Sequence, residues 1–195
     1  AKKVYDGIDS KKVKEMGWFL PRKNLSYENL LDSLLTDPKL LRKNEQQLFG
    51  QYYKLRDVLK KYRQIEKNGG WNPIAIDSLE KTYKPSDSSK TIGQIRQRLA
   101  LTGDLKLDSK SNVYDEELMA GILNYKKRNG FNTDYLIASK HIQRMNIPIE
   151  NYIKTIIANM ERCRWIDPKL TKTDEYIIIN IPSYQFYFKK NGQNE

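Results

Sequence analysis

The end of the chain most constrains its fold, because its pattern differs from everything before it. Residues 175–190, Glu-Tyr-Ile-Ile-Ile-Asn-Ile-Pro-Ser-Tyr-Gln-Phe-Tyr-Phe-Lys-Lys, form two β-rich runs, and Asn191-Gly192 follows them. Asn-Gly is a strong hairpin signal because both turn positions need a positive φ. Only Gln193, Asn194 and Glu195 follow the turn, so we expect the return strand to be missing. The tail, residues 173–195, is therefore predicted to start a truncated β-rich domain.

The composition is typical of a soluble globular protein. The chain has 195 residues, of which 38% are hydrophobic and 30% charged, enough for one domain or two small ones. No apolar run approaches the roughly 20 residues that a membrane-spanning helix needs. The N-terminal sequence Ala-Lys-Lys-Val-Tyr-Asp lacks the apolar core of an intact secretory signal, which leaves open a signal already removed from a precursor.

The formal net charge of +11 suits a polyanionic partner, such as nucleic acid, an anionic membrane surface or a carboxylate-rich wall polymer. The basic residues are dispersed among 24 acidic ones, which is also typical of a solvated, lysine-rich surface. Cys163 is the only cysteine and His141 the only histidine, so neither a disulfide within the chain nor a Cys/His zinc site can form. No metal site and no cofactor are predicted.

Residues 24–67 form the first helical region. Ser26 is placed to cap a helix whose leucines occur as adjacent pairs. Asp37-Pro38 is a second possible helix start. Asn68-Gly69-Gly70 ends the long helix that follows, and Trp71 beside the break either fills a junction between helical units or presents its indole to a ligand. The apolar residues of this long helix recur every three or four positions and share one face: Leu48, Tyr52, Leu55, Leu59 and Tyr62.

Residues 82–90 are polar and turn-rich, and we interpret them as a linker at a domain boundary. A three-helix unit is predicted after it. Gly103 closes its first helix, Asp115 caps the second, Gly130 closes the second, and the third ends before Pro148. A further helix runs from 149 to 165. The apolar residues expected to face inward are Ile92, Ile95, Leu99, Leu118, Ile122, Tyr125, Ile137, Ile142, Met145, Ile153, Ile156, Ile157 and Met160, with His141 among them as a core or boundary residue.

The predicted fold is mainly α, with a short hairpin-like β tail. A helical scaffold is formed by residues 1–81 and completed by residues 147–172. The three-helix unit, about 88–146, is inserted between the two parts of the scaffold, and residues 173–195 follow.

The inserted unit resembles the small peptidoglycan-binding domain of many cell-wall enzymes. The resemblance rests on Tyr114-Asp115 opening the middle helix, on Gly121 and Ile122 within it, on Tyr125 near its end and on Asn129-Gly130-Phe131 after it. Phe131 replaces the leucine of the family pattern, and Tyr135 and Ala138 stand where the family has glycines. The resemblance implies a three-helix fold that binds the glycan strands or stem peptides of peptidoglycan.

The flanking segments extend the resemblance to large L,D-transpeptidases, in which a split helical scaffold surrounds such a unit and leads into a β-rich catalytic domain. This resemblance implies a periplasmic or cell-envelope protein whose partners are peptidoglycan and its own catalytic domain. The segments occur in the family's order: Leu31–Asp37, Gly69-Gly70-Trp71, Leu99–Leu105, Asn159–Trp165 and Tyr176–Pro182.

The catalytic signature of that family is an upstream histidine followed by Ser-His-Gly-Cys-x-Arg, and this sequence has neither. The chain is therefore expected to have no enzymatic activity and no catalytic residue, while its parent is expected to be an L,D-transpeptidase. Cys163 lies between Arg162 and Arg164, which would lower a thiol pKa in an exposed site. Its place on a predicted helix without a histidine partner favours a packing role instead.

Two groups of residues are the candidate sites. Lys126, Lys127 and Arg128, at the end of the second helix of the inserted unit, are candidates for binding peptidoglycan carboxylates. A second group near residue 165 is predicted to brace the scaffold against the β domain, because arginine pairs with carboxylates and tryptophan seals apolar junctions. Its members are Glu161, Arg162, Arg164 and Trp165.

Two other functions compete with peptidoglycan binding. The high charge, the thirteen tyrosines and the three-helix unit also suit a nucleic-acid-binding domain, with residues 115–129 or 137–145 as its recognition helix. Alternatively, the altered loop at Tyr135 and Ala138 favours a scaffold that recruits other wall-synthesis proteins.

Overall fold

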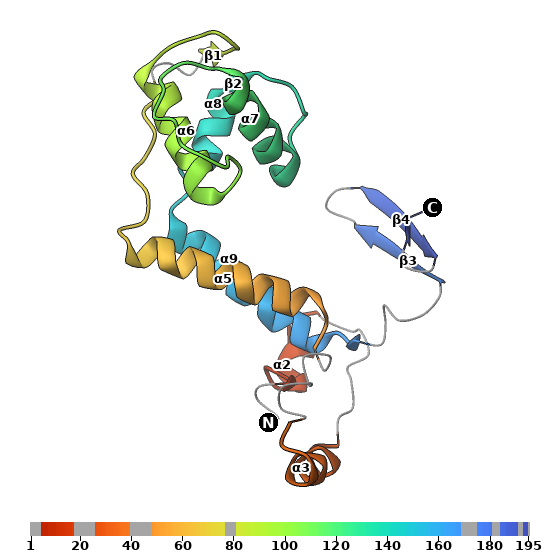
Figure 1. The fold of residues 1–195 in the computed structure, drawn as a ribbon. Helices are drawn as coiled ribbons and strands as arrows, with labels where there is room; N and C mark the ends of the chain where they lie inside the picture. The colour runs from red at the N-terminus through yellow and green to blue at the C-terminus, as the bar shows by residue number, and fades with distance from the viewer. Residues whose placement is uncertain are drawn as a thin grey trace. The chain divides into compact units, whose positions relative to one another are not determined.

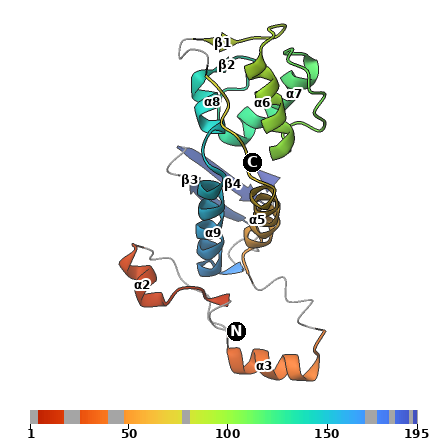
Figure 2. The ribbon, with the colours of Figure 1, turned by 90° about the vertical axis from the view of Figure 1, so that its left-hand side faces the viewer.

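The computed structural model describes residues 5–17, 26–39, 48–76, 81–168, 175–180, 184–190 and 193–194. Over these residues the protein is mainly helical, with two small antiparallel sheets (Figures 1 and 2). The mainly α fold with a β-rich tail is therefore confirmed. The chain divides into two compact units: unit 2 is residues 61–153, and unit 1 is formed by residues 1–60 and 154–195 on either side of it. Unit 2 contains the predicted segment 88–146 and extends beyond it at both ends.

Unit 2 holds three helices and a short β-ribbon. The helices are α6 (Lys90–Thr102), α7 (Glu116–Asn129) and α8 (Ser139–Met145). The strands β1 (Thr82–Tyr83) and β2 (Ile137–Ala138) pair antiparallel, with Tyr83 opposite Ile137. The ribbon thus joins the segment before α6 to the segment before α8.

Local sequence signals set the ends of these helices, as predicted. The Asp115 side chain accepts a hydrogen bond from the backbone N–H of Leu118 and so caps α7. Gly103 and Gly130 follow α6 and α7 with φ of +85° and +70°, the left-handed conformation that glycine adopts without a Cβ clash. Ser89 adds a cap at the start of α6 by accepting from Ile92 N.

The core of unit 2 forms where the inner faces of α6, α7 and α8 meet the β-ribbon. Every inward-facing apolar residue predicted between 92 and 145 is buried there. Their burial removes a continuous apolar surface from water, which is the main force that holds three short helices together. The core residues are Ile74, Tyr83, Ile92, Ile95, Leu99, Leu105, Tyr114, Leu118, Ile122, Tyr125, Ile137, Ile142 and Met145.

Residues 82–90 are not a linker between domains as predicted, because they pair and pack within unit 2. Tyr83 is 2% exposed and belongs to the core, and Ser88 forms an isolated bridge with Val113. Ile137, expected on the third helix, is instead the strand partner of Tyr83. The polar composition concealed a strand because only one of its two residues faces inward, and its partner lies far away in the sequence.

Arg96 is fully buried and connects α6 to the start of α7. Its guanidinium donates to the Asp115 carboxylate at 2.6 Å and to Glu117 Oε2 at 3.0 Å. It also donates to the backbone carbonyls of Ser111 and Val113. A buried charge is tolerated when its donors are paired in this way, so the loop before α7 is fixed by a residue of α6.

Unit 1 contains α2 (Ser10–Glu15), α3 (Tyr27–Thr36) and the outer parts of two long helices, α5 (Gln51–Lys67) and α9 (Ile149–Trp165), whose other ends belong to unit 2. Ser26 caps α3 as predicted. The leucine stripe of α3 is not packed, however, since no residue of this helix is buried and Leu35 is 72% exposed. On α9, Ile153, Ile156 and Met160 are buried as expected, whereas Ile157, also predicted to face inward, is 43% exposed.

The tail forms a three-stranded antiparallel sheet, in the order β3 (Glu175–Asn180), β4 (Gln185–Lys190) and β5 (Gln193–Asn194). Ile177 lies opposite Phe188, and Lys190 lies opposite Gln193. The prediction of a missing return strand is wrong in this respect, because β5 supplies a short one. The expected turn residues, 191 and 192, lie outside the described residues.

A substitution at Gly121 tests the packing of α6 on α7. A Cβ at this position would lie 2.9 Å from Leu105 Cδ1, which is too close for a real contact. Gly121→Val should therefore lower the free energy of unfolding by about 1–3 kcal/mol in urea unfolding. Ala120→Val, on the exposed face of the same helix, should cost only about 0.5 kcal/mol of helix propensity. Equal effects of the two substitutions would contradict the close packing.

Candidate functional site

A short irregular segment, residues 70–76, leaves α5 and runs along α6 within unit 2. Gly69 and Gly70 lie where this segment leaves α5. Their φ values of +100° and +70° are incompatible with the helix, which ends before them. Trp71 follows, and its ring packs edge-on against Tyr62 and Tyr152 at centroid distances of 6.1 and 5.8 Å. Its indole Nε1 donates to the carbonyl of Ile147 at 3.1 Å. Trp71 therefore fills a junction inside unit 2, one of its two predicted roles.

Arg98 of α6 holds this segment in place. Its side chain is buried, and its guanidinium carbon lies 4.5 Å from the centre of the Trp71 ring. The guanidinium donates to the carbonyl of Asn72 at 2.8 Å and also to the carbonyl of Met145. Among the described residues, no carboxylate pairs with it. Burial lowers the pKa of Arg98 to about 10, so the group remains cationic at neutral pH.

Other side chains fix the rest of the segment. Asn146 binds both backbone groups of Ile74, since its Oδ1 accepts from Ile74 N at 2.8 Å and its Nδ2 donates to Ile74 O at 2.9 Å. Gln94 Oε1 accepts from Ala75 N at 3.0 Å. An irregular segment held by this many side-chain hydrogen bonds has little freedom left to lose on binding a ligand.

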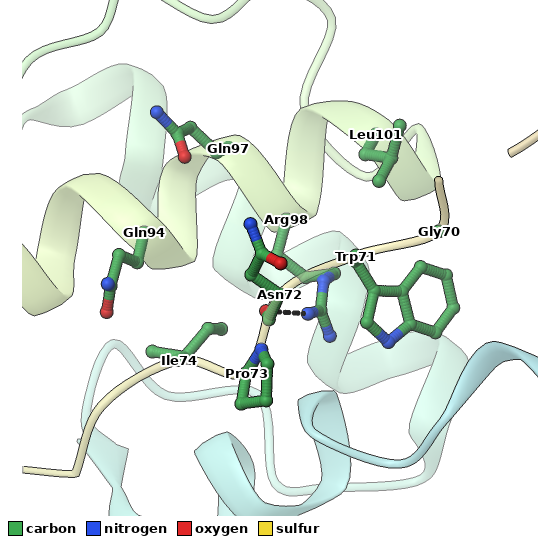
Figure 3. A pocket seen from close by; sticks show the side chains of 9 residues that line it. All are labelled: Gly70, Trp71, Asn72, Pro73, Ile74, Gln94, Gln97, Arg98 and Leu101. Atoms are coloured by element: carbon green, nitrogen blue, oxygen red, sulfur yellow. Dashed lines mark hydrogen bonds between the residues drawn. The ribbon is translucent and has the colours of Figure 1, made fainter. Parts of the chain in front are cut away.

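A pocket of about 260 Å³ lies between this segment and α6 (Figure 3). Its walls combine the amide side chains of Asn72, Gln94 and Gln97 with the apolar surface of Leu101 and Ile74. Buried Arg98 is the only ionised side chain among its lining residues. The pocket is thus polar but almost uncharged at its surface. Sequence reasoning missed it, because it needs residues 70–74 and 94–101 to meet.

Most of the basic side chains predicted to bind a ligand at the end of α7 are bonded to other groups of the protein. Lys126 is 1% exposed, and its ammonium donates to Asp134 and to the carbonyl of Leu136. Arg128 makes two hydrogen bonds to Asp104, at 2.8 and 2.6 Å, and this pairing raises the pKa of Arg128. Lys127 is exposed. Two of the three cations are therefore committed to partners inside unit 2, and Lys127 alone of the three is presented to solvent without such a bond.

Three of the four predicted brace residues, Glu161, Arg164 and Trp165, meet at the carboxylate of Glu161 within unit 1. This carboxylate accepts from Ile8 N at 2.6 Å, from the indole of Trp165 at 2.9 Å and from Arg164 at 2.7 Å. Burial alone would raise the pKa of Glu161, but these hydrogen bonds outweigh it and hold the pKa below its ordinary value.

The N-terminal segment passes very close to this carboxylate. A Cβ on Gly7 would lie 2.0 Å from Glu161 Oε1, and Gly7 has a φ of +69°. Arg164 also donates to the Tyr52 hydroxyl of α5 at 3.2 Å, whereas Arg162, among the residues that the structure describes, bonds to Asn159 on its own helix. Glu161, Arg164 and Trp165 thus tie the ends of α5 and α9 to the N-terminal segment. A brace toward a β domain stays a prediction.

Cys163 and His141 are both buried. Burial raises the pKa of the Cys163 thiol, which is the reverse of what a nucleophile needs, and supports its packing role. His141 Nδ1 accepts from Ala138 N at 2.9 Å, and its ring packs against Phe131. In the described part of the chain, no three acidic, histidine or cysteine side chains gather closely enough to hold a metal ion.

No protein-family model matches this sequence, and a search of curated proteins finds no significant match. Within the described residues, none of the helices combines the length and the apolar character needed to cross a membrane.

Glu161→Gln tests the carboxylate cluster. The substitution removes a charge that accepts three hydrogen bonds, so the free energy of unfolding should fall by about 1.5–3 kcal/mol. Because the folded-state pKa lies below 4.5, the stabilisation is complete above that pH and is lost as the pH falls through the lowered pKa. Arg162→Ala, on the same helix, should change stability by less than about 0.5 kcal/mol. A difference between wild type and Glu161→Gln that persists unchanged in strong acid would contradict the assignment.

The free energy of unfolding of unit 2 should also depend on the protonation of His141. Burial lowers its pKa from 6.5 to about 4, because the folded protein favours the neutral ring whose Nδ1 accepts from Ala138. The unfolded chain binds a proton first as the pH falls, so this stabilisation is complete above 6.5 and is lost between 6.5 and about 4. Urea unfolding should show a loss of up to about 3 kcal/mol over this window, absent in His141→Asn. A slope equal in both proteins would rule out His141 as its source.

Proposed function

We propose that this chain is the non-catalytic scaffold and peptidoglycan-binding region of a periplasmic or cell-envelope protein related to L,D-transpeptidases. In this proposal the parent protein cross-links peptidoglycan stems with a catalytic domain outside this chain, and unit 2 contacts the polymer. The catalytic histidine and the Ser-His-Gly-Cys-x-Arg motif are absent from the sequence, so the chain itself is given no enzymatic role.

The observation that carries the proposal is the agreement between the resemblance and the packing of unit 2. Asp115 caps the middle helix, Gly121 lets Leu105 and Leu99 approach it, and Tyr125 is buried near its end. These are the residues on which the resemblance to a peptidoglycan-binding domain rests. These residues stabilise the fold and are not proposed as ligand contacts. They therefore support the proposal that unit 2 is this kind of domain, and other residues form the proposed binding surface.

A protein-recruiting scaffold is the second candidate, and one surface favours it. Tyr135 and Leu136, in the segment before α8, are 42% and 48% exposed. Adjacent exposed apolar side chains of this size are typical of protein contacts. This candidate requires the chain to capture protein partners without wall polymer.

Sedimentation with purified sacculi tests the proposed function. The chain should move into the pellet with the sacculi at low salt. Pull-down from an envelope extract freed of sacculi tests the second candidate. A chain that stays entirely in the supernatant with sacculi, yet captures proteins, would replace the first function with the second.

A further inference from the structure

We propose that the pocket between residues 70–74 and α6 binds a neutral, acetamido-bearing sugar unit of the glycan strand. The inference rests on the proposed function for the identity of the polymer. It goes further in assigning the contact to the sugar backbone, at a site on α6, rather than to stem-peptide carboxylates at the end of α7.

The first argument is rigidity. The backbone of the segment is fixed by Arg98, Asn146 and Gln94, and the Trp71 ring is locked by two tyrosines and a hydrogen bond. The concave surface is therefore formed before any ligand arrives. A preformed site loses little conformational entropy on binding, which suits a weak, repeated contact along a polymer.

The second argument is chemical. Among the described residues, neither the Asn72 nor the Gln97 side-chain amide bonds to another residue, and both line the pocket. Each amide offers donors and an acceptor, the pattern that matches hydroxyl groups and the N–H and C=O of an acetamido group. An apolar ligand would leave these amides unpaired at a cost in free energy.

The third argument is charge. No acidic or lysine side chain lines the pocket, and Arg98 is only 4% exposed with donors already given to two carbonyls. A carboxylate ligand would meet a guanidinium that is almost inaccessible and already bonded to two carbonyls, which compensates poorly for the lost hydration of the carboxylate. A neutral ligand does not lose the hydration free energy of a charge when it enters the pocket.

Size and shape agree with this class of ligand. A volume of about 260 Å³ is close to the lower end, about 300 Å³, of ordinary small-molecule sites and fits one sugar ring with its substituent. Leu101, which is 39% exposed, gives the acetamido methyl an apolar surface at one end of the pocket (Figure 3). The pocket thus matches a ligand that is polar, uncharged and apolar at one end.

Titration of the ¹⁵N-labelled full chain with the N-acetylglucosamine trimer tests the inference. Amide shifts should change at Gln97, Leu101 and the Trp71 indole. Gln97→Ala should weaken binding about three- to tenfold, the effect of one lost hydrogen bond. Gln97→Trp, which fills the pocket, should weaken it more than tenfold. Gln143→Ala, an exposed glutamine on α8 outside the pocket, is the matched control and should bind as wild type.

The outcomes separate the inference from the proposed function. Sacculus binding that is equal in wild type and Gln97→Trp, with no trimer shifts in the pocket, overturns the inference and leaves the proposed function standing. Trimer binding in the pocket without sacculus binding supports the inference and removes the proposed function. Binding of cellotriose, which lacks the acetamido group, as tightly as the trimer overturns the assignment of the acetamido group. Equally tight binding of a neutral acetylated dipeptide amide overturns the assignment of a sugar.

Discussion

The buried guanidinium of Arg98 is the interaction on which the irregular segment of unit 2 and its pocket depend. It belongs to α6, it lies on the Trp71 ring, and it donates to carbonyls at Asn72 and Met145. A single side chain thus joins a helix, an irregular segment and the end of a second helix. Removing a charge from water is costly, so it must be stabilised by the carbonyls and the aromatic face. Those same contacts give the pocket its fixed wall.

Arg98 is part of a wider pattern in which basic residues act inside unit 2. Arg96 fixes the loop before α7, Lys126 bonds to Asp134, and Arg128 bonds to Asp104. These cations contribute to the net charge although each is already bonded to a group within unit 2. The formal charge of +11 is therefore a poor guide to where unit 2 would contact a polymer. The predicted basic site lies at the end of α7, whereas the pocket lies on α6.

The features predicted correctly from the sequence are those that depend on residues close together in the chain. Helix caps at Ser26 and Asp115 and the glycine ends at 103 and 130 follow from side chains within a few residues of the backbone groups they satisfy. Core positions followed from helical spacing. The pairing of Tyr83 with Ile137 could not be predicted in this way, because the two residues are joined only by tertiary structure. The same holds for the pocket, whose two walls come from separate segments.

The candidate sites show the same limit. Composition identified Lys126, Lys127 and Arg128 as a basic cluster, but it could not show that Asp134 and Asp104 would take up two of them. The Glu161, Arg164 and Trp165 group was found because its members lie within one turn of a helix. Its contact with Ile8 needed the fold, because 153 positions separate the two residues.

The central claim is that a rigid, nearly uncharged pocket on α6 holds an acetamido sugar. Intermolecular nuclear Overhauser effects between the acetamido methyl of the bound N-acetylglucosamine trimer and the protein test it most directly. We expect contacts from that methyl to the side chain of Leu101, at the exposed end of the pocket. Contacts confined to the end of α7, near Lys127, would contradict it.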